Sequence, residues 1–129
     1  MNSYAISRVV DHDYDQAIEK VTEELGKVGF GVLTEIDVSA TLKKKLDVDF
    51  PKYKILGACN PPFALKALRA EEQIGLMLPC NVIVYVNDAG NTVVAAVDPI
   101  ASLMAINNDA VLEIAGEIKL KLEQVINRV

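Results

Sequence analysis

Histidine and cysteine are scarce in this chain of 129 residues, and their scarcity limits its metal chemistry. His12 is the only histidine, and it lies between two aspartates where a helix is expected to begin. Cysteine occurs only at Cys59 and Cys80. Because a structural zinc site usually takes four Cys or His ligands, we expect no metal site within one chain. Ligands supplied by carboxylates or by a second chain are the alternative that this reasoning leaves open.

Positive charge is also in short supply, since 13 Lys and Arg face 18 Asp and Glu and the net charge is −5. The one basic cluster, at residues 43–45, is followed at once by Asp47 and Asp49. A surface that binds nucleic acid needs positive charge to displace counterions. We therefore expect no nucleic-acid partner.

Long apolar runs are missing, and none approaches the ~20 residues that cross a bilayer. The first residues lack the basic segment and apolar core of a signal peptide. We therefore expect a cytoplasmic protein without a membrane partner. In that compartment two cysteines are expected to be free thiols rather than a disulfide.

Two common catalytic fingerprints are absent. Gly29 and Gly31 follow a predicted helix and open a strand, which reverses the order that a dinucleotide or phosphate-binding loop requires. No Gly-x-Ser-x-Gly elbow occurs. Apolar residues, in contrast, are abundant, at 51% of the chain with a mean hydropathy of +0.24. The length fits a single domain over residues 1–129, and the apolar surplus predicts a homodimer that buries an apolar face.

Hydrophobic periodicity and capping residues predict the secondary structure. Strands are expected at residues 3–10, 30–36, 53–59, 80–87 and 91–97, and helices at 14–28, at 61–71, from 107–109 to 129, and as short segments ending at 46 and 106. Asp13 and Gln16 form a capping-box pair at the start of the helix at 14–28. The C-terminal helix has apolar residues at a nearly unbroken spacing of three and four. The order predicts an α+β fold, a two-layer αβ sandwich β-α-β-α-β-α-β-β-α. Its sheet is expected to be mixed, with a C-terminal β-hairpin followed by a long amphipathic helix.

The two strands of this hairpin, around residues 82–86 and 93–97, are too apolar for a sheet with one wet face. We expect helices on one side of them and a partner chain on the other.

Both cysteines lie at junctions marked by proline and followed by asparagine. Cys59 precedes a helix that Asn60 is expected to cap and Pro61 to begin. The N–H groups of a helix start can lower the pKa of such a thiol, although free cysteine is also among the most buried residue types. Cys80 follows Pro79 at the start of a strand, where a packing role is the stronger alternative.

Glu35 is a carboxylate in the middle of a predicted strand. Exposure at the edge of the sheet is the ordinary interpretation, and a site residue is the other. Gly57, also in mid-strand, indicates the close approach of another part of the chain or of a ligand.

The segments Gly29–Leu33, Asp37–Leu42, Tyr53–Pro61 and Leu78–Val82 resemble the family named domain of unknown function 302. The resemblance extends over nearly the whole chain. It implies a small prokaryotic αβ protein with a two-layer fold, often a dimer, and it supplies no established activity. The family motif positions correspond here to Glu35, Cys59, Asn60, Pro61, Pro79, Cys80, Asp98 and Pro99.

We therefore expect a cytoplasmic, dimeric module that binds a small molecule or acts as a sensor, with its pocket near the two cysteine-bearing strand ends. The ligand-binding candidates are Cys59, Asn60, Cys80 and Glu35, and no cofactor is identified. The alternative is a thiol-dependent enzyme with Cys59 as nucleophile or redox centre and Glu35 as acid or base. The lack of a second histidine weakens it, because a thiolate nucleophile usually has a base nearby.

Overall fold

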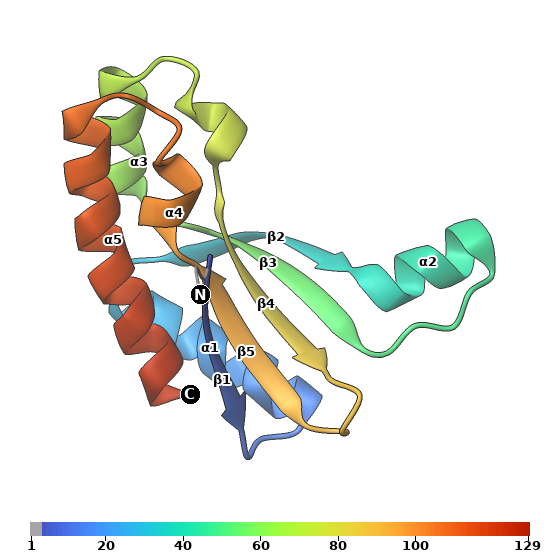
Figure 1. Cartoon of the computed structure of the whole chain (residues 1–129). Coiled ribbons are helices and arrows are strands. Elements are labelled where there is room, and N and C mark those ends of the chain that lie inside the picture. The colour runs from blue at the N-terminus through green and yellow to red at the C-terminus, as the bar shows by residue number, and fades with distance from the viewer. Residues whose placement is uncertain (1–3) are drawn as a thin grey trace.

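The computed structural model describes residues 4–129 as one twisted sheet with most of its helices on one side (Figure 1). The strands are β1 (Ala5–Val10), β2 (Gly31–Asp37), β3 (Tyr53–Cys59), β4 (Cys80–Val86) and β5 (Thr92–Val97). The helices are α1 (Tyr14–Lys27), α2 (Val38–Leu46), α3 (Pro61–Ala70), α4 (Pro99–Leu103) and α5 (Asp109–Arg128), with a 3₁₀ turn, η1 (Ile74–Met77). The two-layer α+β sandwich is confirmed. Residue 3, with which the first strand was expected to begin, lies outside the described residues.

The predicted helix starts are formed by local hydrogen bonds. The backbone N–H of Gln16 donates to Asp13 Oδ1 at 2.8 Å, and Gln16 Oε1 accepts from the Asp13 N–H at 3.2 Å. This is the capping box that the sequence predicts. Asn60 Oδ1 accepts from the N–H of Phe63 at 3.5 Å and so caps α3, as predicted.

The strand order is β1-β5-β4-β3-β2, and every neighbouring pair is antiparallel. The expectation of a mixed sheet was therefore wrong. A parallel pair needs a connection that carries the chain back along the full length of a strand. Here α2 stands away from the sheet, and α3 with η1 stays at one end of it (Figure 1). Neither connection returns along the sheet, so each following strand runs antiparallel beside the strand before it.

One face of the sheet carries the core. The strand side chains that point toward α1 and α5 include the fully buried Leu56, Val84 and Val94. They pack against Leu25 and Leu122. A second, smaller cluster joins α3, η1, α4 and the start of α5. Its buried members are Ala67, Ile74, Leu103, Val111 and Ala115.

The opposite face, here called the outer face, carries no charged side chain on its strands. The registers place on it Ser7, Val9, Ile36, Tyr53, Ile55, Ile83, Tyr85, Val93 and Ala95. The rings of Tyr53 and Tyr85 stack there with centroids 5.2 Å apart. A sheet face that meets water usually carries mostly polar residues, whereas most of the residues on this one are apolar.

The segment formed by α2 and residues 47–52, here called the arm, stands on the side of the sheet away from α1 and α5 (Figure 1). Asp37 caps α2 at one end, and Asp47 ends it in a left-handed conformation. None of the nine residues of α2 is buried. Within residues 4–129 no helix is long and apolar enough to span a membrane.

Candidate ligand-binding site

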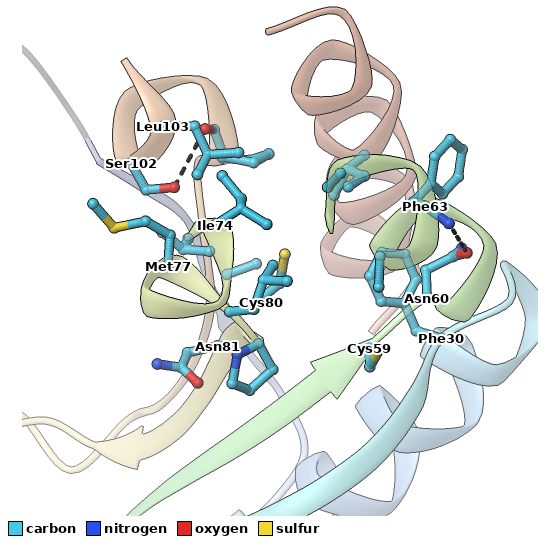
Figure 2. A pocket seen from close by; sticks show the side chains of 18 of the residues that line it. Phe30, Cys59, Asn60, Phe63, Ile74, Met77, Cys80, Asn81, Ser102 and Leu103 are labelled. Atoms are coloured by element: carbon cyan, nitrogen blue, oxygen red, sulfur yellow. Dashed lines mark hydrogen bonds between the residues drawn. The ribbon is translucent and has the colours of Figure 1, made fainter. Parts of the chain in front are cut away.

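A cavity of about 780 Å³ lies at the end of the sheet where β3 stops and β4 starts. Its walls come from α3, η1, α4 and α5 as well as from the strand ends. Figure 2 shows Ile74 of η1 and Leu103 of α4 on one side, Phe63 of α3 on the other, and Cys80 between them. The cavity therefore lies between the two hydrophobic clusters, and both contribute to its wall.

Asn60 holds one side of this cavity in place. Its Oδ1 caps α3, and its Nδ2 donates to the carbonyl oxygen of Val28 at 3.4 Å, just beyond the end of α1. The chain turns away from α1 at Gly29, where φ is +89° and where a Cβ would lie 3.2 Å from Asn60 Nδ2. Asn60 lines the cavity as expected, but both polar atoms of its side chain already have partners within the protein.

Cys59 and Cys80 line the same cavity, and each is partly exposed as a free thiol. Cys80 pairs with Ala58, the residue before Cys59. Because side chains alternate along a strand, the two thiols point to opposite sides of the sheet, which Figure 2 also shows. They are thus neighbours in the wall and do not face one another across the hollow.

The electrostatics of Cys80 oppose ionisation. Burial raises the pKa of its thiol to about 11, with a smaller contribution from the neighbouring Cys59. Since the thiolate is the nucleophilic form, Cys80 is a neutral, weakly polar part of the wall near neutral pH.

Glu35 does not reach the cavity. It pairs with Leu56 on the core side of the sheet, near the β2 edge, and its side chain is exposed. Its Oε1 lies 3.7 Å from the Nζ of Lys54. The register shift between Val32 and Thr34 places Thr34 opposite Gly57 on the cavity side and Glu35 opposite Leu56 on the other side, so Leu33 and Thr34 line the cavity and Glu35 does not. Of the four candidate residues, the structure brings Cys59, Asn60 and Cys80 together and leaves Glu35 outside.

Asn81 is a cavity residue that sequence reasoning missed. It is exposed, it lines the cavity, and its side-chain amide has no hydrogen-bond partner in the part of the chain that the structure describes. Its place directly after Pro79 and Cys80 was the available signal. Ser102 of α4 also lines the cavity, and its hydroxyl donates to the carbonyl oxygen of Pro99 at 3.2 Å.

Gly57 allows the side chains of Thr34 and Pro79 to pack closely against β3 beside the cavity. A Cβ at this position would collide with Thr34 Oγ1 and would lie 2.9 Å from Pro79 Cγ. The register of β2 shifts between Val32 and Thr34, opposite this point. The close approach that the sequence indicated is therefore made by two side chains that themselves line the cavity.

Charge is missing from the cavity wall. Its described lining contains no Asp, Glu, Lys, Arg or His, and its polar atoms come from Thr, Tyr, Asn, Ser and Cys side chains. Among residues 4–129 no group of three or more His, Cys, Asp or Glu side chains is arranged to hold a metal ion. Such a wall can bind an uncharged apolar molecule, but it offers no general base and no counter-charge.

Comparison with known proteins agrees with this fold. A family model described as domain of unknown function DUF302 matches residues 6–129. Among solved structures, the crystal structure of an uncharacterized conserved protein DUF302 from Bacillus stearothermophilus is similar. It has a TM-score of 0.92 and 30% sequence identity, and the match covers 98% of each chain. No curated protein matches the chain.

Proposed function

The chain belongs to the DUF302 family, and we propose that it is a single-domain binding module whose cavity takes a small, uncharged and largely apolar molecule. The observation that carries the proposal is a cavity of about 780 Å³ whose described wall holds no charged side chain. That volume lies within the range of about 300–1,000 Å³ typical of small-molecule sites. Phosphorylated or ionised ligands are disfavoured, because a buried charge without a partner is costly.

A few polar atoms would orient the ligand. The Asn81 amide offers two donors and one acceptor, and Ser102 Oγ keeps acceptor capacity while it donates to Pro99. A ligand with a carbonyl or hydroxyl group at one end of an apolar body would match this arrangement. The Cys59 and Cys80 thiols would add polarizable contacts to the apolar part.

The same geometry favours binding over thiol catalysis. A cysteine nucleophile needs a lowered pKa or a base beside it. The described lining provides no His, Asp or Glu, and Glu35, the expected acid or base, stays outside. Burial moreover raises the pKa of Cys80 rather than lowering it.

The module is proposed to be a cytoplasmic homodimer. Support for the dimer comes from the outer face, where exposed apolar side chains include Val9 and Ile36 and the strand residues are uncharged. Exposed apolar side chains on an uncharged sheet face favour an interaction surface. Two free thiols fit a reducing compartment.

Titration with the neutral fluorescent probe N-phenyl-1-naphthylamine tests the binding function. We expect saturable binding to the native protein and at least a tenfold weaker affinity in Ala67→Phe, because Ala67 lines the cavity and the ring would occupy it. Ala110→Phe is the matched control, since Ala110 is exposed at the start of α5 and outside the cavity lining. Non-saturable binding to the native protein, or equal affinity in a folded Ala67→Phe variant, would refute the proposal.

A further inference from the structure

We infer that the ligand site is composite: in a two-fold dimer, the arm of a second copy of this chain covers the open mouth of the cavity. This inference rests on the proposed binding function and adds a second subunit to the site. It follows from three features of the described chain. The first is the continuity of the cavity with the outer face, and the second is the weak packing of the arm. The third is the distance between the arm end and the cavity end of the sheet.

The cavity opens onto the outer face. Tyr53, Ile83 and Ala95 belong to that face by strand register, and all three line the cavity. A protein that covers the outer face therefore also meets the open side of the cavity. Leu33 and Leu76 stand at this side with 68% and 84% of their surface exposed, which leaves an apolar rim for a partner to cover.

The arm has little packing of its own, mainly the Phe50 ring against Tyr53, with ring centroids 6.3 Å apart. Isolated helices shorter than ~12–15 residues are marginal in water, and α2 has nine residues of which none is buried. Leu46 and Val48 at its far end are 65% and 46% exposed. A helix of this length needs an apolar surface to hold it, and the rim of the cavity on a second copy has the matching character.

The dimensions permit the contact. The arm leaves the sheet at Asp37, which pairs with Lys54 at the start of β3, whereas most of the cavity wall lies at the other end of β3, beyond Cys59. The seven residues of β3 make six steps of ~3.4 Å, which separate these ends by about 20 Å. A two-fold axis between the sheets and across the strands would bring the arm end of one copy over the cavity end of the other. Helix α2, about 13 Å long at 1.5 Å per residue, would span much of the mouth.

A second copy is the occupant that suits this surface best. An isologous contact lets each copy supply an arm and receive one. The outer face measures about 20 Å across its strands at ~4.8 Å spacing. With the arm added, its area is on the order of the ~800 Å² per partner that a stable interface buries. The strand residues on the outer face include no charge that a second copy would have to bury unpaired.

The test measures mass and probe binding together on the full chain. Light scattering gives the mass at micromolar concentration, and N-phenyl-1-naphthylamine gives the affinity. Leu46→Asp and Val48→Asp place a carboxylate on the exposed arm, and Leu120→Asp is the matched control, because Leu120 is 69% exposed on α5 and outside the cavity lining. We expect both arm variants to fall from two chains to one and to lose at least tenfold in probe affinity. The control is expected to match the native protein.

Each other outcome is decisive. A monomeric arm variant with native probe affinity would overturn the composite site and leave the binding function intact. Arm variants that remain dimeric and bind normally would show that the arm is not the covering element. A native protein with the mass of one chain would overturn the composite site. A native protein that fails to bind the probe at all would instead overturn the proposed function.

Discussion

Adding one methyl group at Gly57 should destabilise this protein more than the size of the group suggests. The new Cβ of Gly57→Ala would meet Thr34 Oγ1 on one side and Pro79 Cγ, 2.9 Å away, on the other. The proline ring cannot swing aside, and a β-branched threonine has few rotamers to choose from. Overpacking of this kind typically costs 1–3 kcal/mol. Because the new Cβ clashes with two neighbours at once, we expect the free energy of unfolding to fall by about 2–3 kcal/mol.

Urea denaturation followed by circular dichroism measures this loss, and Gly31→Ala is the control. Gly31 also lies on a strand next to the cavity region, but a Cβ there would meet nothing within 4 Å. We expect the control to change stability by less than about 0.5 kcal/mol, as surface substitutions usually do. The double variant Gly57→Ala/Thr34→Ala removes the Oγ1 collision and should recover about half of the loss, within the range that overpacking costs. Equal stability of Gly57→Ala and Gly31→Ala would refute the reasoning.

Three further predictions concern single polar groups. Asn60→Ala should lower the free energy of unfolding by about 1–2 kcal/mol by removing the α3 cap, whereas Asn60→Asp keeps the cap acceptor and should cost less in urea denaturation. Asn108→Ala should cost about 2 kcal/mol, because its Oδ1 caps α5 and its Nδ2 donates to Ala70 O at 2.8 Å; Asn108→Asp should recover the cap alone. In a Cys59→Ser background, alkylation of Cys80 should accelerate only as pH approaches about 11, and labelling at pH 8 as fast as in denatured protein would contradict its burial.

The raised pKa of Cys80 also predicts that the free energy of unfolding falls as the pH rises into the alkaline range. Its folded pKa, about 11, lies above the ~8.5 of a free thiol. Below both values the thiol is neutral in either state, so its contribution is fully present. As pH rises through this window the unfolded chain ionises first, and stability is lost. Cys80→Ala should therefore flatten the alkaline decline in the melting temperature.

Local sequence signals determined the elements of this fold well, because each depends on residues close together in the chain. Asp13 with Gln16, Asn60 before α3, and the apolar rhythm of α5 all gave helices where they were expected. The sense of the strands was not accessible in this way. It depends on where α2 and α3 lie relative to the sheet, and apolar spacing within a helix says nothing about that. The η1 turn was also missed, because four residues carry no detectable periodicity.

The candidate site shows the same division between local and distant information. Cys59, Asn60 and Cys80 were marked by proline junctions, and the β3–β4 register brings those junctions together. Glu35 was chosen for its chemistry alone, and the register of β2 turns it away from the cavity. Asn81 stood in the same motif as Cys80 but was not chosen, although it also lines the cavity.

The cavity follows from the way the chain divides its apolar residues into two clusters. The large cluster fills the space between the sheet and the helices α1 and α5, and the small one gathers η1 and α4 against α3. Ile114 of α5 packs against both clusters, but the short elements η1 and α4 are too small to close the seam. The Asn108 bond to Ala70 and the 3.1 Å ion pair between Lys119 and Asp98 hold the small cluster from its periphery. Because charge is confined to that periphery, the seam itself stays apolar and open, which is the condition that an uncharged ligand requires.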